Sequence, residues 1–285
     1  MNLQNHQTQS SLPYLVVVPH AAPPDAQAEA VSIFHDANAL DLSDDVVAAA
    51  FDLSTPLTRH TRPGVALDRV RGGIYGWTLN NCFSLLEPDS RAIKQHHGIT
   101  PERAQRIGIR SISYGITGWT ILEAAVQKQF GWRVDLPAGF YLDGERVRMC
   151  FPERDGLLVP CRDHRGFIQA LRYYRHAADD SPVWVSSAKH GGAKAVPSLH
   201  FAGRSNAKRN GIVVLTDHSL RAETIYGGGA ITVVALNGCT PFAVVAQLRA
   251  AYPALRGVIL GDGVAAEPPL CRALVNAGLR WEAGL

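Results

Sequence analysis

The apolar positions toward the end of the chain fall into short runs that alternate with segments of helical spacing. Each strand-like run comes directly before a helix-like one: 212–216 before 220–226, 231–236 before 241–251, and 257–260 before 269–277. A last run at 279–284 can form a closing strand. Strands that alternate with helices of this length form βαβ units. The pattern therefore predicts an α/β fold with a parallel sheet over residues 211–285.

Two helices are predicted in the middle of the chain. Residues 98–112 contain Thr100 as an N-cap, Pro101 in the first turn and Gly108 as the stop. These residue types are the ones that commonly begin and end helices. A second helix is predicted within 118–132.

The segment before residue 211 also contains strand signals. Two apolar runs, 157–159 and 167–168, flank a polar turn that ends in Gly166, and this order predicts a strand-turn-strand. Residues 182–203 predict one more strand followed by a flexible basic loop. A mixed α+β subdomain is therefore expected ahead of the parallel sheet.

Charge is distributed unevenly along the chain. Residues 1–60 hold one arginine and seven acids, a net charge of −6, whereas residues 91–210 hold nineteen lysines and arginines and ten acids, a net charge of +9. A basic region raises the local concentration of phosphate-bearing partners. The alternative is that these charges only solvate the surface.

These shifts in composition predict three parts: an acidic amino-terminal region of unknown role at 1–90, a basic subdomain at 91–210 and the α/β domain at 211–285. Within the first part, Ser43 is expected to cap a helix. No stretch has the roughly 20 apolar residues of a membrane span, so we expect a cytoplasmic protein without a membrane partner. The five cysteines are widely spaced, which indicates neither a disulfide framework nor a zinc ribbon.

Two aspartates follow predicted strands of the parallel sheet. Asp217 comes after the run 212–216, and Asp262 comes after 257–260. Ligands of such sheets gather beyond the carboxyl ends of the strands, and one or two carboxylates together with substrate phosphate oxygens suit Mg²⁺. Both aspartates also have structural alternatives, since Asp217 can cap the next helix and Asp-Gly is a common turn pair. The spacing leaves both alternatives open.

Basic and aromatic residues interleave at 172–176, where bases of a single strand can stack on rings while arginine contacts phosphate. Strand alternation puts only one of Tyr173 and Tyr174 outward, and that ring can instead pack in the core. The candidate nucleic-acid-binding residues are Arg162, Arg165, Arg172, Tyr173, Arg175, Lys189, Lys194 and Arg221. Three histidines, His190, His200 and His218, can supplement a metal site, although loop histidines are more often solvated.

The order of these motifs resembles the catalytic core of bacterial replicative primases and of their relatives on plasmids and phages, which carry a Toprim domain. The quoted segments are "VPCRDHRGFIQALRYYR" at 159–175, "PVWVSSAKHGG" at 182–192 and "LNGCTPFAVVAQLRAAY" at 236–252. The resemblance places Asp217 at the Toprim glutamate and Asp262 at the first acid of the DxD pair.

The sequence also departs from that family. Asp217 is one methylene shorter than glutamate, and Val264 stands where the second acid of the pair is expected. Valine cannot bind a metal ion, although Glu267 or a partner subunit could restore a ligand.

The resemblance implies one of two functions. The first is a metal-dependent nucleotidyltransferase that makes primers on single-stranded DNA from nucleotides, with Asp217 and Asp262 as catalytic residues holding Mg²⁺ or Mn²⁺ and with other replication proteins as partners. The second is a catalytically inactive nucleic-acid-binding protein of a mobile genetic element. A metal-dependent nuclease is a third, weaker alternative. Because of Val264, we expect nucleic-acid binding with weak or absent polymerisation.

Overall fold

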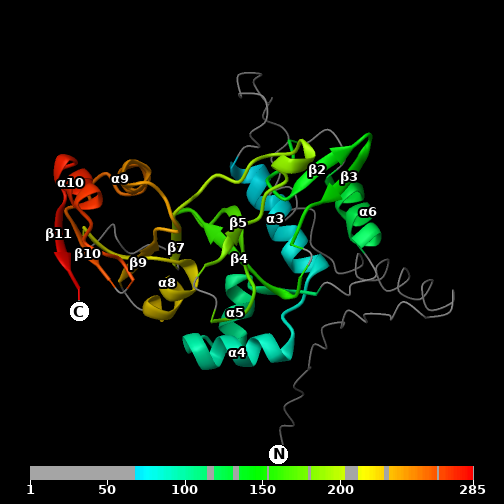
Figure 1. Cartoon of the computed structure of the whole chain (residues 1–285), viewed down its shortest axis with the longest axis horizontal. Helices are drawn as coiled ribbons and strands as arrows, with labels where there is room; N and C mark the ends of the chain where they lie inside the picture. Colours follow the sequence, from blue (N-terminus) through cyan, green and yellow to red (C-terminus); the bar gives the residue numbers. More distant parts are fainter. Residues whose placement is uncertain are drawn as a thin grey trace, which may run out of the picture. The chain divides into compact units, whose positions relative to one another are not determined.

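The computed structural model describes eight stretches of the chain, namely 68–113, 119–130, 135–152, 154–178, 181–202, 211–227, 231–261 and 263–284. All of them fall within one compact unit, residues 56–114 and 119–285 (Figure 1). The helix expected after Ser43 lies outside the described residues. No described helix is both long enough and apolar enough to cross a bilayer.

The first sheet is antiparallel and has four strands in the order β1-β4-β5-β6. Its strands are β1 (Arg110–Ile112), β4 (Gly156–Arg162), β5 (Ile168–Tyr174) and β6 (Val183–Trp184). The predicted strand-turn-strand is therefore confirmed as β4 and β5. The polar turn between them leaves Gly166 with a φ of 92°, a conformation that glycine adopts without strain.

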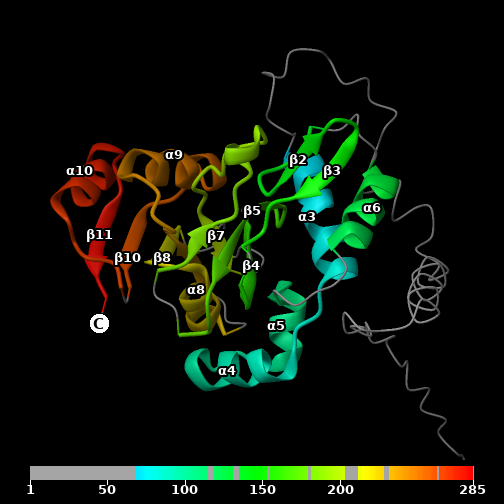
Figure 2. The same cartoon turned by 45° about the vertical axis from the view of Figure 1, so that its right-hand side comes forward.

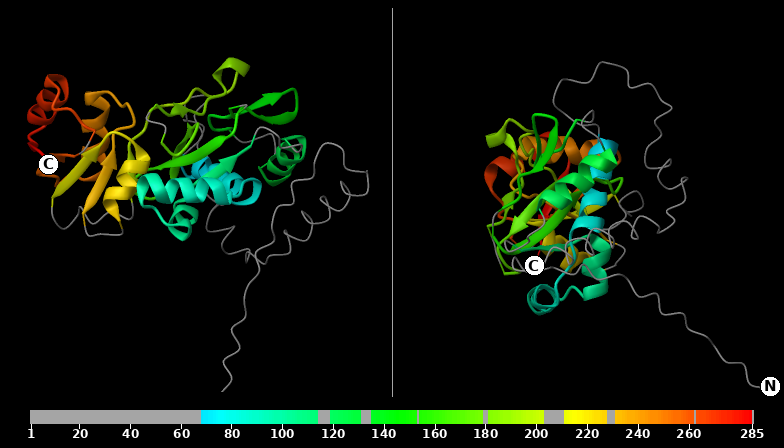
Figure 3. Two further views of the ribbon diagram at one scale, coloured as in Figure 1. Left: turned by 60° about the horizontal axis from the view of Figure 1, so that its bottom comes forward. Right: turned by 90° about the vertical axis from the view of Figure 1, so that its right-hand side faces the viewer.

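Helices pack against both faces of this sheet. Helix α3 (Asp68–Cys82) packs on β5 and approaches it so closely that a Cβ on Gly72 would lie 3.3 Å from the nitrogen of Ile168. The opposite face meets a core that includes residues of α4 (Glu87–His97) and α5 (Pro101–Ile107), drawn in cyan in Figures 2 and 3.

Helix α5 matches the sequence prediction at both ends. The hydroxyl of Thr100 accepts a hydrogen bond from the Arg103 nitrogen at 3.4 Å, Pro101 starts the helix, and Gly108 ends it with a φ of 90°. The second predicted helix is α6 (Trp119–Phe130). Helices α3 and α4 were not predicted from the sequence. The same is true of a hairpin made of β2 (Phe140–Asp143) and β3 (Arg146–Met149).

The second sheet has five strands in the order β11-β10-β8-β9-β7. Its strands are β7 (His200–Ala202), β8 (Ile212–Thr216), β9 (Thr232–Ala235), β10 (Gly257–Leu260) and β11 (Arg280–Ala283). Four of them are parallel, and β7 pairs antiparallel with β9 at one edge. The α/β fold with a parallel sheet is thus confirmed, and the three-part division of the chain stays a prediction.

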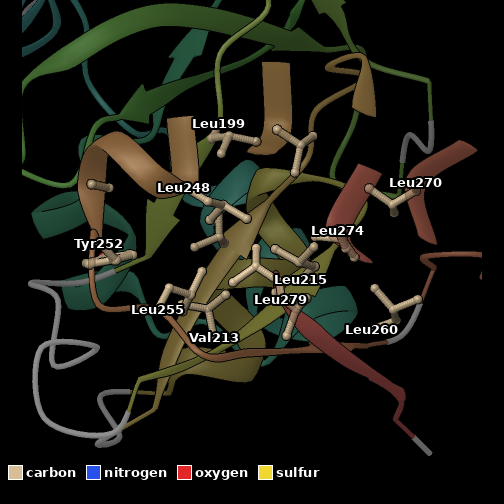
Figure 4. Packing of buried hydrophobic residues seen from close by; sticks show 14 of the residues in the cluster. Leu199, Val213, Leu215, Leu248, Tyr252, Leu255, Leu260, Leu270, Leu274 and Leu279 are labelled. Carbon is tan, nitrogen blue, oxygen red and sulfur yellow. The ribbon is translucent and has the colours of Figure 1, made fainter. Parts of the chain in front are cut away.

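The helices of this second sheet lie on opposite faces. Helices α9 (Pro241–Ala251) and α10 (Pro268–Asn276) pack on the face that includes Val213 and Leu215, where they form the apolar cluster of Figure 4. Helix α8 (Ser219–Tyr226) packs on the other face. Because Leu220 of α8 also belongs to the core of the first sheet, α8 lies between the two sheets. Helix α8 is therefore held from both sides.

Candidate functional site at the carboxyl end of strand β8

The turn between β8 and α8 positions Asp217. Strand β8 ends at Thr216 and α8 begins at Ser219, with His218 as its N-cap. The Nδ1 atom of His218 accepts a hydrogen bond from the backbone nitrogen of Arg221 at 3.5 Å. Asp217 is therefore not the helix cap that the sequence suggested as an alternative, because the next residue has that role.

The carboxylate of Asp217 is engaged within the fold. Its Oδ2 lies 2.8 Å from Nη1 of Arg221, one helical turn later. Its Oδ1 accepts hydrogen bonds from the His218 nitrogen at 2.7 Å and from the Thr216 hydroxyl at 3.2 Å. The ion pair is only partly exposed, with 34% of the Asp217 side chain and 29% of the Arg221 side chain accessible.

The loop after β10 reaches the same ion pair. Leu260 pairs in register with Leu215, so the two parallel strands end side by side. A Cβ on Gly263 would collide with Arg221 Nη1 and would lie 2.6 Å from the Asp217 carboxyl carbon. The predicted convergence of these two loops is therefore observed for Gly263. Asp262 itself lies outside the described residues.

At this turn the carboxylate that the described residues provide is that of Asp217. No cluster of three or more potential ligands is present in the described stretches, and the Arg221 guanidinium lies against the one placed carboxylate. Val264, at the position of the second acid, packs against the apolar cluster beneath α10. Glu267 is exposed and precedes α10. The positive charge opposite Asp217 is thus supplied by arginine.

A second acid on α8 forms a buried network that the sequence analysis missed. Glu223 accepts hydrogen bonds from Nη2 of Arg103 at 3.1 Å and from Nε2 of His200 at 3.0 Å. Arg103 also donates to the Glu223 carbonyl. His200 is fully buried, and only 5% of the Glu223 side chain is exposed. The one available signal was that Glu223 falls on the apolar face of α8, where an acid requires a partner.

The hydrogen bonds of this network orient His200 and favour the ionised form of Glu223. The Nδ1 atom of His200 accepts the backbone N–H of Arg162 at 3.1 Å, so Nε2 is the ring nitrogen that donates to Glu223. Burial raises the pKa of Glu223, but the hydrogen bonds and charges of His200 and Arg103 outweigh it, and the pKa lies below its ordinary value. Glu223 is therefore an ionised acid inside the protein.

Asn237 joins the two sheets on the other side of this turn. It follows β9 with a φ of 50°, and its nitrogen donates to the Asp217 carbonyl at 2.8 Å. Its side-chain oxygen accepts from Arg172 Nη1 at 2.9 Å and from the Ser219 hydroxyl at 3.1 Å. The turn that carries Asp217 is thus held to strand β5 through Asn237.

Several polar atoms near this turn are buried without a hydrogen-bond partner among the described residues, namely Nε2 of His218, the hydroxyl of Tyr174 and Nε of Arg172. The rings of Tyr174 and His218 lie 6.1 Å apart. Burial is the main reason that the pKa of His218 lies below its ordinary value, and the Asp217 carboxylate acts in the opposite direction. His200 and His218 are therefore both buried, and the expectation of solvated loop histidines is wrong for them.

Two candidate nucleic-acid-binding residues point into the interior. Arg172 is 8% exposed, donates to the Pro182 carbonyl at 2.7 Å and stacks on Trp184 at 5.0 Å. Tyr173 is 4% exposed, and its hydroxyl donates to the Asp155 carbonyl at 2.7 Å. Tyr174 is buried as well, so the expected outward-facing tyrosine is absent. The reason is that β5 is an inner strand of a sheet covered on both faces.

Two further candidates, Arg162 and Arg165, are occupied by local contacts. Arg162 donates to the carbonyls of Ile107 and Gly166 at 2.9 and 3.0 Å. Arg165 forms ion pairs with Asp68 at 2.6 Å and Asp163 at 2.7 Å. Both side chains therefore already have acceptors in the β4–β5 turn and in the helices packed on the first sheet.

The remaining three candidates, Arg175, Lys189 and Lys194, are exposed. Lys189 lies in a short 3-10 helix, η1 (Ala188–His190), and the next residue, His190, stacks on Tyr141 with ring centroids 4.8 Å apart. The hydroxyl of Ser187 donates to the carbonyl of Phe140 at 2.7 Å. Lys189 lies in the loop that was predicted to be flexible. This part of the loop is anchored to the β2–β3 hairpin.

No family model and no curated protein sequence matches this chain. Its structure is similar to that of the Aquifex aeolicus primase (zinc-binding and RNA polymerase domains), with a TM-score of 0.56 and 15% identity over 86% of this chain and 62% of that one. The chain thus spans about three fifths of the length of that relative.

Two further solved structures resemble it. One is the RNA polymerase domain of Mycobacterium tuberculosis primase DnaG in complex with double-stranded DNA, with a TM-score of 0.52 and 14% identity over 76% of this chain and 72% of that one. The other is a DnaG primase catalytic domain bound to single-stranded DNA, with a TM-score of 0.50 and 17% identity over the same shares. The described chain therefore has the fold of a bacterial primase catalytic core.

Proposed function

We propose that the protein is a primase-fold nucleic-acid-binding protein in which Arg221, rather than a metal ion, neutralises Asp217. The observation that carries this proposal is the packing of Val264 against the apolar cluster, at the position expected for a second acid, beside the 2.8 Å ion pair of Asp217 and Arg221. On this account the protein binds single-stranded nucleic acid and has weak or absent primer synthesis.

Metal-dependent nucleotidyl transfer requires a cation that holds phosphate oxygens and stabilises the charge that develops on them. Breaking a partly exposed ion pair costs only about 0–1 kcal/mol, so Arg221 alone would not prevent a cation from binding. The absence of a second carboxylate weakens metal binding more, because Val264 packs against the apolar cluster and has no side-chain oxygen.

The proposed contacts with nucleic acid are the exposed residues Arg175, after β5, and Lys189 and Lys194, in the segment after β6 (Val183–Trp184). The stacked pair of His190 and Tyr141 adds an aromatic face next to Lys189, and aromatic rings beside cations are the usual platform for single strands. The primases bound to single-stranded and double-stranded DNA support this proposal through their shared fold.

Fluorescence anisotropy of a labelled single-stranded oligonucleotide tests the proposal across a range of salt concentrations. Each lost phosphate contact lowers the slope of log affinity against log salt by about 0.7 for a single strand. Lys189→Gln with Lys194→Gln should therefore reduce the slope by about 1.4. The control Arg280→Gln removes an exposed charge from β11, at the other edge of the five-stranded sheet, and should leave the slope unchanged. Equal slopes for all variants would refute this surface.

A second candidate function is a nucleotidyltransferase that uses Mg²⁺ or Mn²⁺ and nucleotides to make primers, in contact with other replication proteins of a plasmid or phage. It is favoured by the position of Asp217 at a strand end beside the loop that contains Asp262. Product formed from single-stranded DNA, nucleotides and metal by the native protein, but not by Asp217→Asn or Asp262→Asn, would support it.

A further inference from the structure

A cavity of about 160 Å³ lies between helix α3 and the β4–β5 turn, away from the Asp217 site. Its lining includes Gly76 and Asn80 on α3, Arg162 at the end of β4, and Gly166 and Phe167 in the turn. Asn80 and Gly166 are exposed to solvent. The cavity is therefore open to small molecules at that side.

The charged side chain that lines this cavity is that of Arg162. Arg162 donates only to main-chain carbonyls, those of Ile107 and Gly166. Arg110, close by, donates to the Leu79 carbonyl at 2.9 Å and to the side-chain oxygen of Asn80 at 2.8 Å. Among the described residues, neither arginine forms an ion pair. Burial lowers the pKa of both. The charge of Arg162 lowers the pKa of Arg110 further, whereas the Glu223 carboxylate acts on Arg162 in the opposite direction.

Two acids close to the β4–β5 turn, Asp163 and Asp68, form ion pairs with other arginines. Asp163 pairs with Arg165 and accepts the Phe167 N–H at 2.9 Å. Asp68 pairs with Arg165 and with Arg71, at 2.6 and 3.6 Å. An anion entering the cavity would therefore meet the Arg162 guanidinium, which has no carboxylate paired with it among the described residues.

We propose that this cavity is an anion site that takes a phosphoryl group, held by Arg162 with help from the amide of Asn80. Arginine suits phosphate because its planar fork presents several donors to the phosphate oxygens. The cavity is smaller than the roughly 300 Å³ at which sites for whole drug-sized ligands begin. It therefore holds a phosphoryl group whose nucleoside or strand remains outside.

Two variants and one control test the proposal. Gly76 lines the cavity, and a Cβ there would meet no atom within 4 Å, so Gly76→Leu should place its side chain in the cavity. Arg162→Gln removes the principal donor. Arg106→Gln removes the same charge from an exposed position on α5 and leaves the cavity intact. Because Arg162 also binds the Ile107 carbonyl, Gly76→Leu keeps the test valid if Arg162→Gln unfolds.

Equilibrium dialysis of the full chain with radiolabelled inorganic phosphate, at constant ionic strength, gives the first readout. We expect saturable binding of one phosphate by the native protein and by Arg106→Gln, and at least tenfold weaker binding by Gly76→Leu and Arg162→Gln. No saturable binding by the native protein, or equal binding by all four proteins, would overturn the proposal. Arg162 would then serve only to hydrogen-bond the Ile107 and Gly166 carbonyls.

The source of the phosphoryl group is distinguished by competition. A 5′-phosphorylated oligonucleotide that displaces phosphate better than its 5′-hydroxyl form identifies a strand end, and displacement by AMP at the concentration of free phosphate identifies a mononucleotide. Binding of the 5′-hydroxyl oligonucleotide depends on Lys189 and Lys194 and should be unchanged in Gly76→Leu. Failure of the anion site is thus distinct from failure of the nucleic-acid surface.

Discussion

Replacing Glu223 by glutamine should destabilise the protein strongly, because Glu223 is the shared acceptor of a buried network. The carboxylate accepts from His200 at 3.0 Å and from Arg103 at 3.1 Å. Glutamine retains one acceptor for His200 but turns an amide N–H₂ toward the Arg103 guanidinium. Arg103 is then left without its acid in a site where only 18% of its side chain is exposed.

The magnitude follows from these contacts. Removing one partner of a buried pair costs about 3–5 kcal/mol, and the remaining exposure of Arg103 places this case at the lower end. We expect a loss of about 3 kcal/mol. In a domain of roughly 150–250 residues, each kcal/mol lowers Tm by about 2–4 °C, so the expected fall in Tm is about 6–12 °C.

Urea unfolding followed by tryptophan fluorescence measures this loss, with Glu87→Gln as the control. Glu87 makes the same kind of ion pair with Arg91, but the side chains are 82% and 73% exposed. The control should therefore change the free energy of unfolding by less than about 0.5 kcal/mol. If Glu223→Gln changed it by no more than the control, the network would not stabilise the fold as described.

Three further predictions concern Glu223, Gly263 and Asn237. The pKa of Glu223 is lowered in the folded state. The stability that its carboxylate contributes is therefore present above the ordinary pKa of glutamate and is lost as the pH falls through the lowered value. Below the ordinary pKa, the free energy of unfolding should fall less steeply with decreasing pH in Glu223→Gln than in the native protein. Gly263→Ala should lower Tm more than Gly166→Ala, since both positions have positive φ but only the Cβ at 263 collides with the ion pair; equal Tm values would contradict the packing of this loop. Asn237→Gly keeps the left-handed backbone but removes the bond to Arg172, and urea unfolding should show a loss of about 1–3 kcal/mol; an unchanged midpoint would remove Asn237 as a link between the sheets.

Much of the fold follows from local sequence signals. Helix α5 could be predicted because Thr100, Pro101 and Gly108 each carry a capping preference that is independent of the rest of the chain. The strands β8 and β10 could be predicted because their apolar runs are bounded by turns. Strand β7 could not, since it has only three residues and its pairing partner β9 lies about 35 residues away, His200 opposite Ala235.

The site was less predictable because it depends on contacts between distant segments. Alternation was expected to turn one of Tyr173 and Tyr174 outward, but helices cover both faces of their strand and both rings are buried. Glu223 meets Arg103 and His200, which are 120 and 23 residues away in the sequence. Asp217 was correctly placed at the end of β8. Its ion pair with Arg221 was not predicted, and a metal ion bound by Asp217 would have to compete with this pair.

The most direct test of the central claim is a primer-synthesis assay with single-stranded DNA, nucleotides and Mg²⁺ or Mn²⁺, run beside a DNA-binding assay in EDTA. Our account predicts that DNA binding persists in EDTA and that the native protein and Asp217→Asn give the same trace or absence of product. Metal-dependent product that disappears in Asp217→Asn would contradict it.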